Sequence, residues 1–189
     1  MNAVVIRKIY SLSYRLTILY RRFICLVFNP FVSIGRGTVI DSGVKLFPRM
    51  GGNIFIGNSC EIKTGALLQT YGGDIRIGNH SSINAYTIIH GGGNVDIGSH
   101  VRIAPQCMIV SFNHNFDSID IFIDKQGKIQ KGIKIEDDVW IGSGVRVLDG
   151  VTISKGCVIG AGSVVTKSTL PYSVYVGIPA RMIRRRRLN

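Results

Sequence analysis

The chain has 189 residues, of which 46% are hydrophobic and 18% are charged, a balance typical of one globular domain with a buried core. Its formal net charge of +12 calls for an anionic partner, such as a phosphate-bearing cofactor or an anionic membrane surface. The positive charge is concentrated at the two ends and no recognition motif accompanies it, so we expect no nucleic-acid partner.

Residues 1–30 are expected to form an N-terminal helical segment. Apolar side chains recur there at helix-like spacing, at Leu12, Leu16, Leu19, Phe23, Leu26 and Val27. The Asn29-Pro30 pair ends the segment, because a residue before proline avoids the helical conformation.

This N-terminal segment is basic, with no acidic residue before Asp41. Residues 1–28 are therefore expected either to contact an anionic membrane peripherally or to dock on the rest of the assembly, and both interpretations stay open. The uncharged run between Arg22 and Arg36 is too short to span a bilayer, which needs about 20 apolar residues. Without a convincing secretory signal, we expect a cytoplasmic protein, peripheral to the inner face of the membrane if the segment binds lipid.

An aliphatic residue recurs every six positions through the middle of the chain. The repeats form six groups of three, at Ile34, Ile40, Leu46, Ile56, Ile62, Leu68, Ile77, Ile83, Ile89, Ile97, Ile103, Ile109, Ile135, Ile141, Val147, Ile153, Ile159 and Val165. The fifth residue of each complete six-residue unit is small or β-branched. This period predicts an all-β solenoid of about six triangular coils over residues 31–170, with the aliphatic side chains inward.

Two further segments stand outside this repeat. Residues 112–134 are a long polar insertion, and long loops in compact domains are often functional. Residues 171–189 are expected to be a basic C-terminal tail, ending in four arginines. Among the cysteines, Cys60, Cys107 and Cys157 fall at the small inward position of the repeat, which favours core filling over metal or redox chemistry.

Three strings in the chain are similar to those of a known family. They are IGSHVRIAPQCMIVSFNHNFD, IEDDVWIGSGVRVLDGVTISKGCVIGAGSVVTK and VGIPARMIR. They resemble the hexapeptide-repeat acyltransferases, in particular the galactoside and maltose O-acetyltransferases and their cell-surface polysaccharide relatives. The resemblance covers roughly residues 34–184. It implies a left-handed β-helix, a homotrimer, and acetyl-CoA held between adjacent subunits with no metal required.

The resemblance assigns the chemistry to His114, at the start of the insertion. It implies that His114 is the general base that takes the proton from the acceptor hydroxyl, a role that imidazole suits near neutral pH. Asn84 matches the family asparagine that holds the acceptor sugar, although an asparagine there could equally cap a turn.

Acetyl-CoA is expected to contact a set of residues later in the chain. The outward Trp140 would flank the pantetheine arm or pack between subunits, and the Ser143 N–H would donate to the acetyl carbonyl. The remaining matches to the family's CoA contacts are Ala161, Thr166, Lys167, Arg181 and Arg184. Lysine and arginine have a physical reason to lie there, because CoA carries three phosphate groups.

Two further features bear on the substrate and on metals. Gly91, Gly92 and Gly93 stand where the simple sugar O-acetyltransferases have acidic residues, which suggests a more open lip for a larger glycan acceptor. His80 and His100 occupy the same position in successive units and are expected to stack, although a pair of exposed turn residues is a weak zinc signal.

The sequence thus predicts an acetyl-CoA-dependent O-acetyltransferase that modifies a sugar hydroxyl of a cell-surface polysaccharide or of its lipid-linked or nucleotide-linked precursor. Two alternatives use the same scaffold: a metal enzyme of the γ-carbonic-anhydrase kind, and a non-catalytic solenoid that only binds partners. The first needs three converging histidines, of which only His114 is in place.

Overall fold

The computed structural model describes residues 29–187, which form a parallel β-solenoid of six coils. Sheet A contains β1 (Val32–Ile34), β4 (Ile54–Ile56), β7 (Ile75–Ile77), β10 (Val95–Ile97), β15 (Ile133–Ile135) and β18 (Thr152–Ile153). Sheet B contains β2 (Val39–Ile40), β5 (Glu61–Ile62), β8 (Ser82–Ile83), β11 (Arg102–Ile103), β16 (Trp140–Ile141), β19 (Val158–Ile159), β21 (Ser173–Gly177) and β22 (Ala180–Arg185). Sheet C contains β3 (Lys45–Phe47), β6 (Leu67–Gln69), β9 (Ile88–His90), β12 (Met108–Val110), β17 (Arg146–Val147) and β20 (Val164–Val165).

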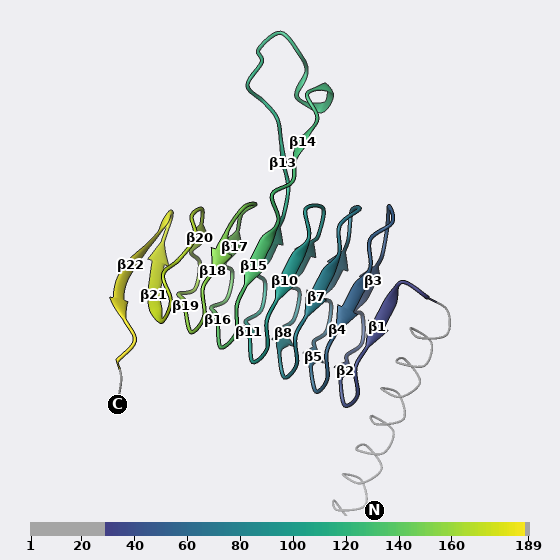
Figure 1. The fold of residues 1–189 in the computed structure, drawn as a ribbon, viewed down its shortest axis with the longest axis vertical. Coiled ribbons are helices and arrows are strands. Elements are labelled where there is room, and N and C mark those ends of the chain that lie inside the picture. Colours follow the sequence, from purple (N-terminus) through teal and green to yellow (C-terminus); the bar gives the residue numbers. More distant parts are fainter. Residues whose placement is uncertain (1–28, 188–189) are drawn as a thin grey trace, which may run out of the picture.

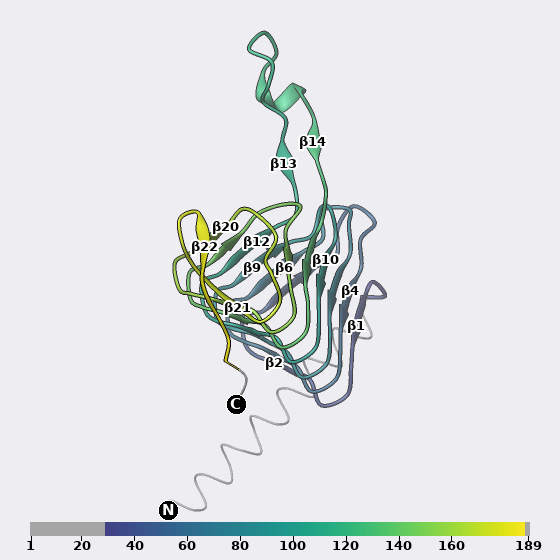
Figure 2. The same cartoon turned by 60° about the vertical axis from the view of Figure 1, so that its left-hand side comes forward.

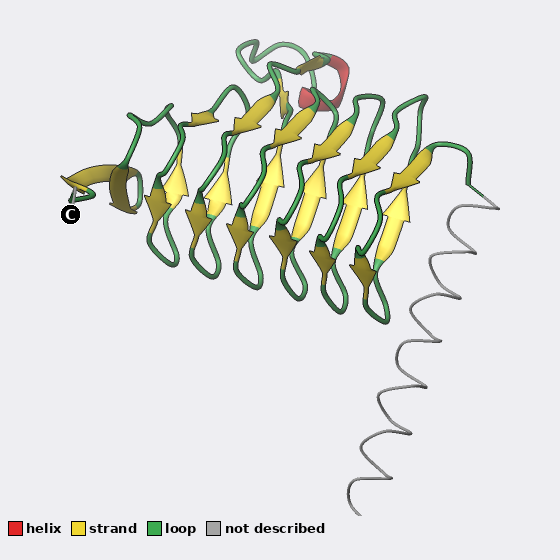
Figure 3. Cartoon of the chain, turned by 60° about the horizontal axis from the view of Figure 1, so that its bottom comes forward, coloured by secondary structure: helices red, strands yellow, loops and turns green. Residues whose placement is uncertain are grey.

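Each coil contributes one short strand to each sheet, and the coils lie side by side along the molecule (Figure 1). We call the turns between the sheets the A–B, B–C and C–A corners. The architecture confirms the expected left-handed β-helix of about six coils. Figure 3 shows how little of the described chain is helical: one short 3-10 turn lies in the insertion.

The predicted inward positions form the core. In sheet B, for example, Ile83, Ile103 and Ile141 pair in register and each is fully buried. Burial of one such side chain contributes about 1.5–3 kcal/mol, and each coil can bury its aliphatic residues only against its neighbours. Leu46, in the first coil, is only partly buried because it has a neighbouring coil on one side.

The small residues before the strands fill the corners and satisfy the backbone. Ser81 is buried, its hydroxyl donates to the Gly98 carbonyl (2.9 Å) and it accepts from the Val101 N–H (3.0 Å). Cys60 is likewise buried, and its thiol lies 3.0 Å from the Gly78 carbonyl oxygen. Burial raises the pKa of the Cys60 and Cys107 thiols, so both are poor nucleophiles and the core-filling interpretation is confirmed.

Side-chain oxygens link successive coils at the A–B corner. The Asn58 side chain accepts from the Arg36 N–H (2.7 Å), and the Asn79 side chain accepts from the Asn58 N–H (2.8 Å). Ser99 and Asp137 continue the same ladder into the next two coils. Each side chain satisfies a backbone donor that the turn leaves without a strand partner.

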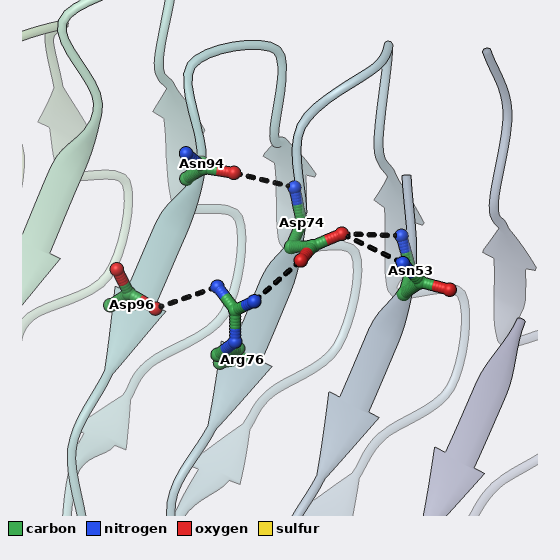
Figure 4. Close-up of polar contacts among 5 residues, drawn as sticks. All are labelled: Asn53, Asp74, Arg76, Asn94 and Asp96. Carbon is green, nitrogen blue, oxygen red and sulfur yellow. Dashed lines mark hydrogen bonds and ion pairs between the residues drawn. The ribbon is translucent and has the colours of Figure 1, made fainter. Parts of the chain in front are cut away.

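A second ladder runs along the C–A corner where sheet A begins, shown in Figure 4. Asp74 accepts from the backbone N–H (2.8 Å) and side-chain amide (3.1 Å) of Asn53, and Asn94 accepts from the Asp74 N–H (2.8 Å). Arg76 forms ion pairs with Asp74 and with Asp96. Burial alone would raise the pKa of Asp74, but the Asn53 hydrogen bonds and the Arg76 charge outweigh it, so the pKa is lowered.

The insertion leaves the prism at the C–A corner after β12 and returns at β15. It contains β13 (Asn113–His114), the turn η1 (Ile123–Lys125) and β14 (Lys128–Ile129), and β13 pairs with β14 as an antiparallel hairpin. The hairpin projects well beyond the coils (Figures 1 and 2). Its tip is held by Gln126, whose side-chain amide donates to the Ser118 (2.8 Å) and Ile121 (2.7 Å) carbonyls.

The expected C-terminal tail is not a separate segment. β21 continues sheet B in parallel with β19, and β22 turns back along β21. Arg186 then forms an ion pair with Asp138 (2.8 Å), so the arginine run is attached to the prism at least to this residue. The boundary predicted at residue 170 therefore lies inside a continuous sheet.

The predicted N-terminal helical segment lies outside the described residues and stays a prediction, as does its contact with a membrane. Within residues 29–187, no helix has the length and apolar character needed to cross a bilayer.

Candidate active site

The predicted site residues lie at two different corners of the prism. Asn84, Ser143 and Ala161 follow the paired strands β8, β16 and β19, so they lie along the B–C corner. His114 lies on the hairpin that leaves the C–A corner. Thr166 and Lys167 follow β20 at that same corner.

These two corners are too far apart within one chain for their residues to meet. Sheet C separates them, and in the fourth coil the extended path from Cys107 to Ser111 covers four residues, or roughly 13 Å at about 3.3 Å per residue. The hairpin carrying His114, which contains β13 and β14, extends away from the prism (Figure 2). A single chain therefore holds the predicted site residues in two separate groups, which we call the two half-sites.

Asn84 is partly exposed and its side chain is used in part by the fold. The side-chain amide donates to the Ile103 carbonyl (2.7 Å), as the turn-capping alternative predicts. Its side-chain oxygen Oδ1 accepts no hydrogen bond from another residue of the described chain. That oxygen can accept a hydrogen bond from a ligand hydroxyl, so capping and ligand binding are compatible.

His114 is exposed, and its imidazole contacts the ring of Phe112 edge-on, with centroids 6.5 Å apart. Phe112 in turn belongs to an aromatic cluster with Tyr71 and His90. The ring centroid of Tyr71 lies 4.9 Å from that of His90 and 5.7 Å from that of Phe112. The His90 and Phe112 rings are nearly parallel, with centroids 6.3 Å apart. Burial lowers the pKa of His90, which favours its neutral form.

This aromatic cluster was not predicted from the sequence, although a signal for it exists. Tyr71, Gly92 and Phe112 each stand three positions after the last aliphatic residue of their coil, and alignment of the coils places them in one column. Residues that share a column in a solenoid lie above one another.

The glycine run at 91–93 is packed and does not form the open lip that we expected. A Cβ on Gly93 would lie 2.4 Å from the Ser111 carbonyl oxygen and 2.8 Å from the Gly132 nitrogen. A Cβ on Gly92 would lie 2.9 Å from the Phe112 ring. These glycines are required because backbone and rings of the next coil lie directly against them.

The predicted acyl-donor residues at the B–C side are accessible. Trp140 is 56% exposed and points outward from sheet B, between Arg102 and Val158 of the neighbouring strands. Ser143 is exposed, and its N–H donates to no other described residue. That N–H is free to donate to a ligand oxygen.

The predicted basic contacts are also accessible. Lys167, Arg181 and Arg184 are exposed, and the two arginine side chains donate only to the Ala180 (2.9 Å) and Arg185 (3.3 Å) carbonyls within the described chain. From residue 150 to its end, the sequence has seven lysines and arginines and no acidic residue. This end of the prism therefore carries an excess of positive charge suited to phosphate groups.

The outward face of sheet C, between the two half-sites, carries more apolar than polar side chains, the polar ones being Lys45, Gln69, His90 and Arg146. Its outward side chains include Leu67, Ile88, Met108, Val110 and Val164, all partly exposed. By contrast, sheet A presents Arg76, Asp96 and Lys134 outward. Apolar side chains gathered on one outward face of a solenoid mark an interaction surface.

His80 and His100 stack as predicted, with centroids 5.0 Å apart and an interplanar angle of 15°. No group of three or more histidine, cysteine, aspartate or glutamate side chains that could hold a metal ion occurs within residues 29–187.

Comparisons with known proteins agree on one family. Residues 132–167 match the family described as bacterial transferase hexapeptide (six repeats). The chain is 32% identical over 159 residues to the probable acetyltransferase Rv3034c of Mycobacterium tuberculosis, a match that covers 84% of this chain but about half (51%) of the relative's length.

Two solved structures extend the comparison. A hexapeptide-repeat containing acetyltransferase from Vibrio cholerae, VCA0836, is 31% identical, with a TM-score of 0.59 over 75% of this chain and 73% of that one. A mutant of AntD, an N-acyltransferase from Bacillus cereus, is 25% identical, with a TM-score of 0.73 over 82% and 84% of the two chains. That structure is a complex with dTDP-4-amino-4,6-dideoxyglucose and coenzyme A.

Proposed function

The chain belongs to the hexapeptide-repeat acyltransferases, and on that premise we propose that it transfers an acetyl group from acetyl-CoA to a sugar hydroxyl of a cell-surface glycan or of its precursor. The proposal rests on one observation. The predicted site residues lie at the B–C and C–A corners of the prism, on either side of the outward face of sheet C.

The apolar face of sheet C supports a homotrimer. With this face turned toward a threefold axis, the B–C corner of one subunit meets the C–A corner of the next. Asn84 and Ser143 of one subunit then lie beside His114 of its neighbour. Assembly buries the apolar side chains and completes the site in the same step.

His114 acts as the general base in this arrangement. Its imidazole takes the proton of the acceptor hydroxyl while the hydroxyl oxygen attacks the thioester carbonyl carbon. The Ser143 N–H donates to the oxygen that becomes negatively charged, and His114 returns the proton to the departing thiolate. General-base catalysis contributes about 10²–10⁴-fold, and an oxyanion donor about 10²–10³-fold.

The acyl-donor side fits CoA by charge and by shape. Lys167, Arg181 and Arg184 lie in the part of the chain that lacks acidic residues, and they suit its phosphates. Trp140 flanks the apolar pantetheine arm, and its indole loses unfavourable exposure on binding. Ala161 is exposed at the B–C corner and Thr166 at the C–A corner, so in the trimer Ala161 of one subunit and Thr166 of the next complete the proposed groove.

A CoA-release assay tests the proposal. Purified protein with acetyl-CoA and a panel of glycan acceptors should release free CoA in an acceptor-dependent manner, and His114→Ala should lower the rate about 10²–10⁴-fold. The matched control is His100→Ala, an exposed histidine at the A–B corner, which should retain the wild-type rate. An unchanged rate in His114→Ala would rule out the role given to this residue.

A second candidate acceptor is the amino group of a nucleotide-linked amino sugar. It is favoured by the likeness to AntD, whose structure contains such a sugar together with coenzyme A. Transfer to dTDP-4-amino-4,6-dideoxyglucose with no transfer to hydroxyl acceptors would decide for this candidate.

A further inference from the structure

We propose that Tyr71, His90 and Phe112 form a wall that binds the pyranose ring of the acceptor sugar beside His114. This inference rests on the proposed function, since it assigns the acceptor subsite of the same reaction. It names sugar-binding residues other than Asn84.

The wall is contiguous with the proposed base. Phe112 is the link, since its ring contacts both Tyr71 (5.7 Å) and His114 (6.5 Å). Phe112 lies directly before β13, the strand that carries His114. A sugar resting against this wall therefore has its hydroxyl groups within the neighbourhood of the imidazole.

Gly92 explains why three coils can build one wall. Tyr71 and Phe112 are two coils apart, about 9.6 Å at roughly 4.8 Å per coil, yet their ring centroids are 5.7 Å apart. The rings converge across the coil between them because Gly92 places no side chain there. His90, from the strand of that middle coil, contacts both rings.

The chemistry of the wall suits a sugar ring, and Lys128 Nζ, which lies over the Phe112 ring at 5.0 Å from its centroid, places a positive charge beside it. All three rings are partly exposed, and a pyranose presents a face of C–H groups that packs on aromatic carbon. Burial lowers the pKa of His90, so its ring is neutral and adds no charge to the surface. The Tyr71 hydroxyl makes no hydrogen bond to another residue among 29–187, and it is available to a sugar hydroxyl.

The experiment measures sugar binding without catalysis. Saturation-transfer NMR would be recorded on the wild-type protein with methyl glycosides of the common hexoses as probes. Tyr71 has φ of 51°, a conformation that asparagine tolerates, so Tyr71→Asn removes the ring with little backbone strain. We expect it to weaken binding of the best glycoside about 2- to 12-fold.

Two controls separate the wall from general effects. Tyr71→Phe should keep binding within about 2-fold if stacking dominates over the hydroxyl. Phe55→Leu removes a 40% exposed ring from sheet A, away from His114, and should leave binding unchanged. The thermal unfolding midpoint of each variant is also measured, and a midpoint close to that of wild type shows that the fold is intact.

The outcomes distinguish this inference from the proposed function. Glycoside binding that is lost in Tyr71→Asn and kept in Phe55→Leu supports the wall, even if the CoA-release assay fails. If the protein shows acceptor-dependent CoA release but Tyr71→Asn binds the glycoside as tightly as wild type, the proposed sugar-binding role of the wall is refuted. The acetyltransferase proposal then stays intact. Absence of binding for every methyl glycoside also overturns the wall.

Discussion

Mixed trimers of two inactive variants should regain activity if the site is shared between subunits. His114→Ala removes the proposed base at the C–A corner, and Asn84→Ala removes the proposed sugar contact at the B–C corner. The two residues lie at different corners of one chain, on either side of sheet C, so neither variant can be rescued within its own subunit. A site is complete only where Asn84 of a His114→Ala chain faces His114 of an Asn84→Ala chain.

The expected recovery follows from the symmetry of the trimer. Every trimer with both kinds of chain, in either two-to-one ratio, contains one interface with both intact residues. Its activity should therefore be about one third of the wild type, against near zero for either variant alone.

Co-expression of the variants with two different affinity tags allows this measurement. Purification over both tags selects the mixed trimers, and acceptor-dependent CoA release is then compared with wild type. The control is co-expression of two His114→Ala chains, one with each tag, and the trimers purified over both tags should stay inactive. Mixed trimers no more active than the single variants would refute the shared site and the role of sheet C in forming it.

Four further predictions concern single residues. Ile103→Ala, at a fully buried core position, should lower the free energy of unfolding by about 2–5 kcal/mol, measured by chemical denaturation. Gly93→Ala should cost about 1–3 kcal/mol in the same assay, because its Cβ would press on the Ser111 carbonyl. Trp140→Ala should leave the thermal midpoint unchanged and weaken CoA binding several-fold, about 2- to 12-fold, by calorimetry. For Asp74 the folded pKa is depressed, so its stabilising contribution is present above its ordinary value of about 3.9 and is lost as the pH falls through the folded pKa. Wild type should therefore lose more thermal stability than Asp74→Asn on acidification from pH 6 to about pH 3, and parallel curves would contradict this account.

Much of the fold is predictable because the period of the repeat is a local property. The six-residue step places Ile83, Ile103 and Ile141 on the inside whatever their distant neighbours are, and all three are buried. The same step predicted buried, unreactive cysteines and an outward Trp140. Beyond residue 170, β21 extends sheet B by pairing with β19, and this pairing does not follow from the six-residue pattern.

The candidate site was predictable only residue by residue. Motif resemblance assigned His114 and Asn84, and the structure places each where a ligand can reach it. The motif resemblance did not indicate that His114 and Asn84 lie in different half-sites, because a motif carries no information on which corner of the prism faces a neighbouring subunit.

The sequence thus contains the coil and the inward face, since each depends on spacing over a few positions, and its motifs name the residues proposed to react. The aromatic cluster and the packed glycines arise from the stacking of coils about 20 residues apart, as in the pairing of Gln69 with His90 and of His90 with Val110. Loops of different length between the coils hide that register in the linear chain. Only after the coils stack do Tyr71 and Phe112 close over Gly92, because the van der Waals contact of two rings depends on three-dimensional distance alone.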